Sequence, residues 1–182
     1  MKKNNNEVEL KFKVDNYVNI KNLLKKLGAE FVGKAFERTV RFDTENQSLE
    51  QDGKFLRTRT GFKNVITFKR KIENNDFKER EEVEFEIADT EKMNYILKNL
   101  GFSKILIMEK HREKWNFNNT EVVLDELPMG NYMEIEGDEE SIVKVANSLE
   151  LNLDDKITGT YWDIWKDFSK KNGIDDENII FK

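Results

Sequence analysis

The chain has 182 residues, of which 37% are hydrophobic and 37% are charged, and its formal net charge is −5. This length suits one domain with a sizeable core, and the negative net charge argues against general nucleic-acid binding. The absence of cysteine excludes disulfides and thiolate chemistry, and a single histidine, His111, excludes a poly-histidine metal site.

The N-terminal segment 1–6 is not followed by an apolar run, and no stretch approaches the ~20 apolar residues of a membrane span. We therefore expect a cytoplasmic protein with no membrane partner and no nucleic-acid partner. Any metal in a protein with this composition would be held by oxygen ligands, which favours Mg²⁺, Mn²⁺ or Ca²⁺.

The first half of the chain is predicted to contain four strands, with one helix between the first two. A strand is predicted at 7–14, and a helix with apolar residues at helical spacing follows at 18–27, capped by Asp15 and ending at Gly28. Further strands are predicted at 37–42, 54–60 and 64–70.

The second half repeats this pattern. A strand at 80–87 precedes a helix that starts at Asp89 and ends at Gly101. Strands follow at 105–117, 121–125 and 131–136, then helices at 141–149 and 161–168. We expect one domain over 1–168 and a loosely held tail over 169–182, with docking of the tail through Ile174, Ile179, Ile180 and Phe181 as the alternative. The repeated strand–helix–strand unit suits a pseudo-symmetric antiparallel sheet that closes on itself.

Charged residues two apart recur on these strands, and such residues point to the same side of a strand. Glu7-x-Glu9-x-Lys11 shares one face, as do Arg57 with Arg59 and Glu82 with Glu84. An antiparallel sheet with one solvated face would explain this alternation. A barrel with a charged lumen is favoured, because the signs segregate by strand and because Arg and Glu occur where Thr or Ser would serve solvent equally well. Acid pairs facing base pairs suggest a metal site beside an anion site.

An ordered set of motifs spans about residues 7–168. It resembles the CYTH domain of the triphosphate tunnel metalloenzymes in Glu7-x-Glu9-x-Lys11, Leu56-Arg57-Thr58-Arg59, Thr67-Phe68-Lys69, Arg80-Glu81-Glu82-Val83-Glu84, Lys110-His111-Arg112, Val123-Leu124-Asp125 and Glu134-Ile135-Glu136. The resemblance implies an α+β fold, a closed eight-stranded antiparallel β-barrel (tunnel) with a charged lumen and with helices packed outside.

The resemblance also implies roles for residues of the lumen. Divalent cations, Mg²⁺ or Mn²⁺, would be held by Glu7, Glu9, Glu134 and Glu136. The triphosphate would be bound by Lys11, Arg57, Arg59, Lys69, Arg80, Lys110 and Arg112. Catalytic or substrate-orienting carboxylates would be Glu82, Glu84 and Asp125. The alternative for Glu82 and Glu84 is mutual neutralisation with neighbouring cations.

The chain departs from the family pattern at two places. Many relatives have a Lys-Ser-Tyr-like segment where this chain has Gly159-Thr160-Tyr161, so a tunnel lysine is absent or is replaced by Lys156. Many relatives also have Gly-Pro where this chain has Arg70-Lys71. The aromatic residues Tyr161, Trp162, Trp165 and Phe168 are predicted to pack a helix, with nucleobase stacking as the alternative.

The function expected from the resemblance is metal-dependent hydrolysis of tripolyphosphate or of a nucleoside or thiamine triphosphate. The alternative is a class IV adenylate cyclase, which converts ATP to cyclic AMP and pyrophosphate in the same tunnel. A second alternative is a non-catalytic polyphosphate or nucleotide sensor, although its need for so many carboxylates would be unexplained. A homodimer is compatible with such a fold, but no surface feature of the sequence argues for one.

Overall fold

The computed structural model describes residues 6–71 and 78–182, and the side chains of residues 8–71 and 81–182. The strands are β1 (Asn6–Lys13), β2 (Glu30–Asp43), β3 (Lys54–Thr60), β4 (Val65–Lys71), β5 (Lys78–Glu86), β6 (Ser103–Phe117), β7 (Thr120–Leu127) and β8 (Gly130–Glu136). The helices are α1 (Tyr17–Lys26), α2 (Ser48–Gln51), α3 (Thr90–Asn99), α4 (Glu139–Ser148) and α5 (Tyr161–Asn172), with a 3₁₀ turn at Leu153–Asp155.

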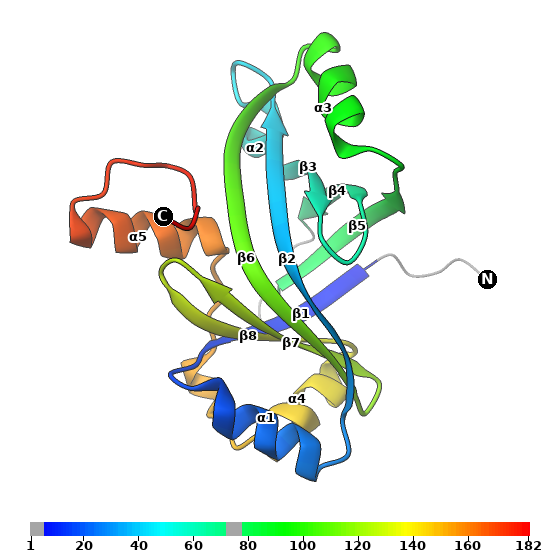
Figure 1. The fold of residues 1–182 in the computed structure, drawn as a ribbon, viewed down its shortest axis with the longest axis vertical. Coiled ribbons are helices and arrows are strands. Elements are labelled where there is room, and N and C mark those ends of the chain that lie inside the picture. Colours follow the sequence, from blue (N-terminus) through cyan, green and yellow to red (C-terminus); the bar gives the residue numbers. More distant parts are fainter. Residues whose placement is uncertain (1–5, 72–77) are drawn as a thin grey trace.

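The strands form one antiparallel sheet in the order β1-β5-β4-β3-β2-β6-β7-β8 (Figure 1). Strand β1 pairs with β5 over Asn6–Glu9 and with β8 over Glu9–Lys13, so the two pairings overlap only at Glu9. The predicted α+β class with eight antiparallel strands is confirmed. Closure of this sheet into a barrel that encloses a tunnel stays a prediction.

The repeated unit seen in the sequence is present as two strand–helix–strand segments, β1-α1-β2 and β5-α3-β6. Helix α1 is capped by Asn16, whose side chain accepts a hydrogen bond from the Val18 amide, and not by the predicted Asp15. Asp89 caps α3 as predicted. Gly28 and Gly101 follow the two helices with positive φ, the conformation that glycine adopts at low cost after a helix. Local signals therefore set both ends of each helix.

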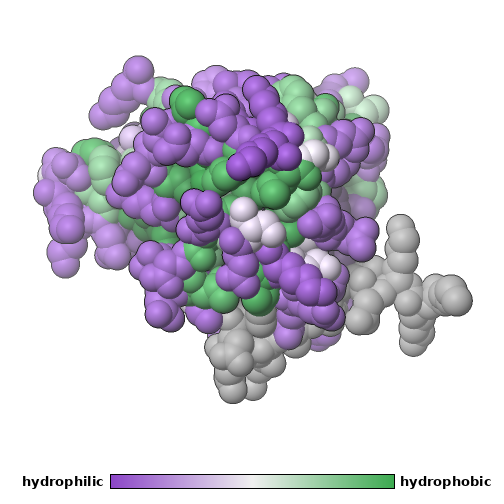
Figure 2. All heavy atoms as spheres, turned by 90° about the horizontal axis from the view of Figure 1, so that it is seen from below, coloured by the Kyte–Doolittle hydropathy of each residue, from purple (hydrophilic) through white to green (hydrophobic). Residues whose placement is uncertain are grey.

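The main hydrophobic core lies between the sheet and helices α1 and α4. Alternate residues of β1, β7 and β8 face this core, among them Leu10, Phe12, Leu124 and Ile135, and Leu24 is fully buried opposite them. The charged residues between them point to the other face of the sheet. Figure 2 views this end of the molecule and shows a largely hydrophilic surface in which hydrophobic side chains form a central band. None of the helices in the described part of the chain is both long and apolar enough to cross a membrane.

Helix α5 packs against the opposite, charged face of the sheet. Its residues Tyr161, Trp162 and Trp165 form a buried cluster with Met108 and Tyr132. Met108 shares its strand face with Lys110, and Tyr132 with Glu134, because each pair is two residues apart. The prediction that helices pack only outside is therefore wrong for α5. The predicted aromatic packing is confirmed, but it takes place on the inner face.

The C-terminal segment is docked where a loose tail was predicted. Strand β6 has 15 residues and β7 has 8, and β7 begins to pair with β6 only at His111. The Ile179 amide donates to the Ile107 carbonyl, the Glu109 amide donates to the Ile179 carbonyl, and the Asn178 side chain accepts from the Ile107 amide. The segment thus covers a β6 edge that β7 leaves unpaired.

We expect Ile179→Ala to lower the free energy of unfolding by about 2–4 kcal/mol, the usual cost of truncating a fully buried isoleucine. Ile179 is fully buried in the cluster that contains Trp165. Urea denaturation followed by tryptophan fluorescence measures the change. Ile180→Ala is the matched control, because its side chain is only half-buried and its truncation should cost less. Equal costs for the two variants would mean that Ile179 is not an anchor of the segment.

Candidate functional site

The charged face of the sheet borders a cavity of about 1150 Å³. Most of the predicted site residues line it, and they come from six of the eight strands: Glu9, Lys11, Arg57, Arg59, Lys69, Glu82, Glu84, Lys110, Arg112, Glu134 and Glu136. The side chains of the predicted residues Glu7 and Arg80 lie outside the described part of the chain, although their backbones are paired across β1 and β5. The alternation of charged residues in the sequence therefore predicted which of these distant residues lie on the face that borders the cavity.

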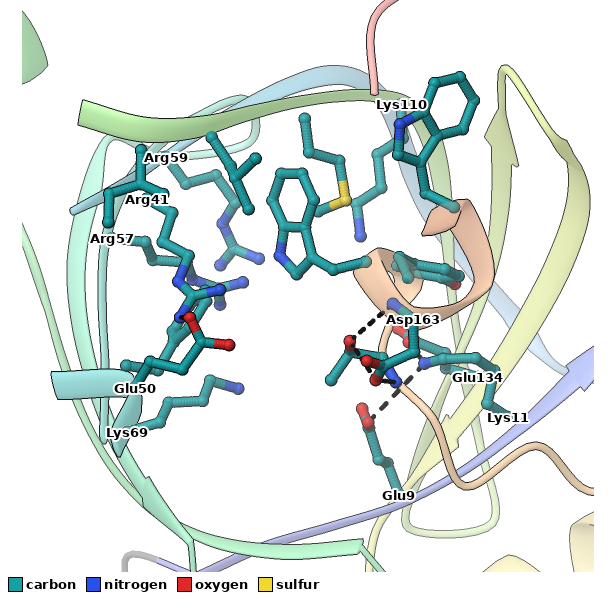
Figure 3. Close-up of a pocket in the computed structure, with 18 of the residues that line it drawn as sticks. Glu9, Lys11, Arg41, Glu50, Arg57, Arg59, Lys69, Lys110, Glu134 and Asp163 are labelled. Atoms are coloured by element: carbon teal, nitrogen blue, oxygen red, sulfur yellow. Dashed lines mark hydrogen bonds and ion pairs between the residues drawn. The ribbon is translucent and has the colours of Figure 1, made fainter. Parts of the chain in front are cut away.

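Two walls of different character face each other across the cavity (Figure 3). One wall carries the guanidinium and ammonium groups of Arg41, Arg57, Arg59 and Lys69, from β2, β3 and β4. The other wall carries Glu9, Lys11, Glu134 and Lys110, with Asp163 of α5 beside them. An anionic chain on the basic wall would thus face carboxylates across the open space.

Carboxylates of β5 hold the basic wall in place. Glu82 lies 2.6 Å from the Lys69 ammonium, and Glu84 lies 3.3 Å from Arg59 Nη2. The Thr67 hydroxyl donates to Glu84 at 2.7 Å and accepts from Arg57 Nε at 3.2 Å. Glu82 and Glu84 thus lie where they neutralise neighbouring cations, as in the alternative to their catalytic role, and the catalytic role stays a prediction.

Lys11 is the centre of the opposite wall. It is ion-paired with Glu134, lies 3.7 Å from Glu9, and stands 4.3 Å from the centre of the Tyr161 ring. Burial alone would lower the pKa of Lys11, but the charges of Glu134 and Glu9 outweigh it and raise that pKa. Lys11 therefore carries a fixed positive charge between two predicted metal ligands.

Asp125 lies beneath this wall and does not line the cavity. It is fully buried, it accepts from Lys110 Nζ at 3.0 Å and from Arg112 Nε at 2.6 Å, and Tyr161 donates to it at 2.8 Å. Burial opposes its charge, yet Arg112 and Lys110 hold the pKa of Asp125 below its ordinary value. Burial and the nearby Arg112 lower the pKa of Lys110. The position of Asp125 suits orienting Lys110 and Arg112, the two cations predicted to bind phosphate, better than direct contact with substrate.

Glu37 of β2 is a site residue that the sequence reasoning missed. Its side chain is 2% exposed, and its Oε2 lies 3.7 Å from Lys110, 3.8 Å from Arg112 and 3.8 Å from Arg59. Burial raises the pKa of Glu37, but these cations outweigh it and lower the pKa overall. A Cβ at Gly61 would lie 2.7 Å from Glu37 Cγ, so a glycine is needed there for this carboxylate to fit.

The predicted metal ligands fit a hard cation by donor type. Glu9, Glu134 and Glu136 line the cavity with carboxylate oxygens, and Glu9 and Glu136 are cross-strand neighbours of β1 and β8. Among the residues that the structure describes, no three acidic or histidine side chains cluster closely enough to form a complete metal cage. The individual ligands stay predictions.

The departure at Gly159-Thr160-Tyr161 is not compensated by Lys156, which is exposed and does not line the cavity. Thr160 instead caps α5 through a capping box with Asp163. This cap directs Tyr161 into the site, where its hydroxyl reaches Asp125. Burial raises the pKa of Tyr161 well above its ordinary value, so its hydroxyl remains a donor.

Tyr161→Phe should lower the free energy of unfolding by about 1–2 kcal/mol, because one hydrogen bond to a buried, charged acceptor is lost while the ring stays in place. Chemical denaturation measures this change. Tyr95→Phe is the control, because Tyr95 is 70% exposed and its hydroxyl contributes little to stability. Equal stability of Tyr161→Phe and wild type would show that the hydroxyl bond to Asp125 makes no net contribution.

Comparison with known proteins agrees with this geometry. The family model described as "CYTH domain" matches residues 5–161, which confirms the resemblance seen in the sequence. A protein of Methanocaldococcus jannaschii with a provisional adenylate cyclase name is 30% identical over 178 residues, which are 97% of this chain and 94% of that protein. A solved structure from Pyrococcus horikoshii is 30% identical, covers 85% of this chain and 96% of its own, and has a TM-score of 0.74.

A more distant structure shares the fold. It is a protein from Hippeastrum, described as an adenylyl cyclase candidate with a dominant triphosphatase activity. It is 19% identical, covers 92% of this chain and 88% of its own, and has a TM-score of 0.57.

Proposed function

Because the chain belongs to the CYTH family, we propose that it is an enzyme that hydrolyses a linear triphosphate inside a tunnel enclosed by its eight strands. The observation that carries this proposal is the basic wall of Arg57, Arg59 and Lys69 facing carboxylates across one cavity (Figure 3). Guanidinium groups bind phosphate oxygens in a bidentate manner, so such a wall orients a polyanionic chain.

The proposed reaction is attack of water on the terminal phosphorus. The bond between that phosphorus and the bridging oxygen breaks, which releases orthophosphate and leaves diphosphate on the basic wall. Arg57, Arg59 and Lys69 would hold the chain in line, and Lys110 and Arg112 would neutralise the developing charge. Glu9, Glu134 and Glu136 would hold a divalent cation, Mg²⁺ or Mn²⁺, which when bound neutralises phosphate charge and helps to position the reactants.

Adenylate cyclase activity is the second candidate. It is favoured by the provisional name of the 30% identical relative and by the size of the cavity, which at about 1150 Å³ leaves room for a nucleoside beside the phosphates. In that reaction the ribose 3′-hydroxyl would attack the α-phosphorus and pyrophosphate would leave. Both reactions use the same basic wall and differ in which phosphorus meets the nucleophile.

Phosphorus NMR of the purified protein with ATP or with tripolyphosphate, in the presence of Mg²⁺ or Mn²⁺, separates the two. Each reaction is stopped with a chelator, which removes the metal before the spectrum is recorded. We expect orthophosphate to appear, and we expect tripolyphosphate to be consumed faster than ATP. Cyclic AMP with stoichiometric pyrophosphate would establish the cyclase instead. Absence of turnover with every triphosphate tested, thiamine triphosphate included, would contradict both reactions.

A further inference from the structure

Arg41 of β2 lies on the basic wall, but the sequence analysis predicted no role for it in the site. Its side chain lines the cavity beside Arg57 and Arg59 (Figure 3). Arg41 and Arg57 are direct cross-strand partners of β2 and β3, so their side chains leave the sheet on the same face. Their guanidinium carbons lie 5.4 and 5.9 Å from the centre of the Phe55 ring.

Like charges directly opposite each other on neighbouring strands are unfavourable unless an anion lies between or beside them. Glu84 lies 3.8 Å from Arg57 Nη2, and Glu50 lies 3.1 Å from Arg41 Nη2. The Arg41 side chain is only 10% exposed, and its Nε is buried without a hydrogen-bond partner among the described residues. Arg41 therefore has at least one buried donor for which the described protein supplies no acceptor.

The carboxylate that pairs with Arg41 is more exposed than the carboxylates that pair with Lys110 and Arg112. Asp125 and Glu37, which accompany Lys110 and Arg112, have side chains that are 0% and 2% exposed. The Glu50 side chain is 49% exposed, and ion pairs of such exposed carboxylates contribute little. Arg41 can therefore exchange its carboxylate partner for a ligand oxygen more easily than Lys110 and Arg112 can.

The backbone of Glu50 is nevertheless fixed. The buried carboxylate of Asp43 accepts the amides of Leu49 and Glu50 at 2.9 and 3.0 Å, which anchors the short helix α2 to the end of β2. Glu50 thus places a half-exposed carboxylate beside Arg41 while its backbone is held by Asp43.

We propose that Arg41 and Arg57 form a twin-arginine subsite for one phosphoryl group of a linear polyphosphate, and that Glu50 is the counter-ion which this phosphoryl group displaces. The inference rests on the proposed function and deepens it, because it assigns a further substrate-binding residue and a competitor within the protein. It requires that loss of Arg41 and loss of Glu50 have opposite effects on affinity.

The test is isothermal titration calorimetry with inorganic tripolyphosphate, in the presence of a chelator so that no turnover occurs. We expect Arg41→Gln to raise the dissociation constant about tenfold, the loss of one charged hydrogen-bonding partner. Glu50→Gln should lower it about threefold, because a weak exposed competitor is removed. The double variant should bind like Arg41→Gln alone, since Glu50 acts only through Arg41.

Arg57→Gln is the reference variant, and thermal melts show which variants are folded. If Arg57→Gln weakens binding and Arg41→Gln does not, the twin-arginine subsite is overturned while the proposed function stands. If Glu50→Gln weakens binding, Glu50 is a ligand rather than a competitor and the inference also fails. If the wild type does not bind tripolyphosphate, the subsite for a linear polyphosphate is overturned, and turnover in the phosphorus NMR experiment decides separately whether the proposed function stands. Should Arg41→Gln not fold, Arg41→Lys and Glu50→Gln carry the same comparison, with Arg41→Lys expected to lose affinity because it cannot bind bidentately.

Discussion

Replacement of Asp125 by alanine is expected to lower the free energy of unfolding by about 3–5 kcal/mol, the cost of leaving buried charges without their partner. Among the described residues, Asp125 is the side chain that accepts the hydrogen bond of the Tyr161 hydroxyl, and it also binds Lys110 and Arg112. Arg112 would keep its bond to Glu134 at 2.6 Å, but the carboxylate left nearest to Lys110 among the described residues would be Glu37, at 3.7 Å. The loss should therefore exceed that of any single surface ion pair.

Urea denaturation at neutral pH measures this effect, and Glu140→Gln is the matched control. Glu140 also pairs with a lysine, Lys144, but both side chains are exposed, so its removal should cost well under ~1 kcal/mol. Asp125→Asn should fall between the two, because the amide keeps one oxygen acceptor. A loss for Asp125→Ala as small as that for Glu140→Gln would mean that the buried network does not hold the cations in place.

Strand parity made most of the site predictable. Residues two apart on one strand must share a face, so Glu9 with Lys11, Arg57 with Arg59, and Lys110 with Arg112 were assigned to one surface before any pairing was known. The structure brings all of them to one cavity. Helices α1 and α3 were also predictable, since their terminal glycines and the Asp89 cap of α3 are encoded within a few residues, although α1 is capped by Asn16 and not by the predicted Asp15.

What escaped prediction depends on contacts between distant segments. The assignment of Arg41 to the basic wall requires the register that places it opposite Arg57. That register cannot be predicted from the sequence of either strand alone. Glu37 is opposite Lys110 for the same reason. Strand β2 begins at Glu30, well before the predicted start at residue 37. The prediction missed this first part because a register irregularity between Phe31 and Gly33 interrupts the alternation that a strand prediction needs.

The placement of α5 on the inner face was likewise not predictable from its own pattern. An amphipathic aromatic helix would pack equally well on either face of a sheet. The choice is made by Tyr161 reaching the buried Asp125, and by the segment around Ile179 pairing with β6. These contacts join residues more than 30 positions apart in the chain, so no local sequence pattern predicts them.

Replacement of Glu9 by glutamine is expected to reduce metal-dependent turnover by about 10³-fold while leaving the fold intact. Glu9 lines the cavity and is one of the carboxylates assigned to the divalent cation. Glutamine keeps the size of the side chain but removes the charge that a hard cation requires. Lys11 would keep its pair with Glu134, so the wall around it should remain in place.

The measurement is the rate of phosphate release from tripolyphosphate at increasing Mg²⁺ or Mn²⁺, with a thermal melt of each variant. Glu121→Gln is the control, because Glu121 lines the same cavity but pairs with Lys114 at 2.8 Å and has no assigned role at the cation. If Glu9 acts through the metal, its variant should also need a higher metal concentration for half-maximal rate, and Glu121→Gln should not. Equal losses in both variants would point to the general charge of the cavity, and an unchanged rate for Glu9→Gln would remove Glu9 from the metal site.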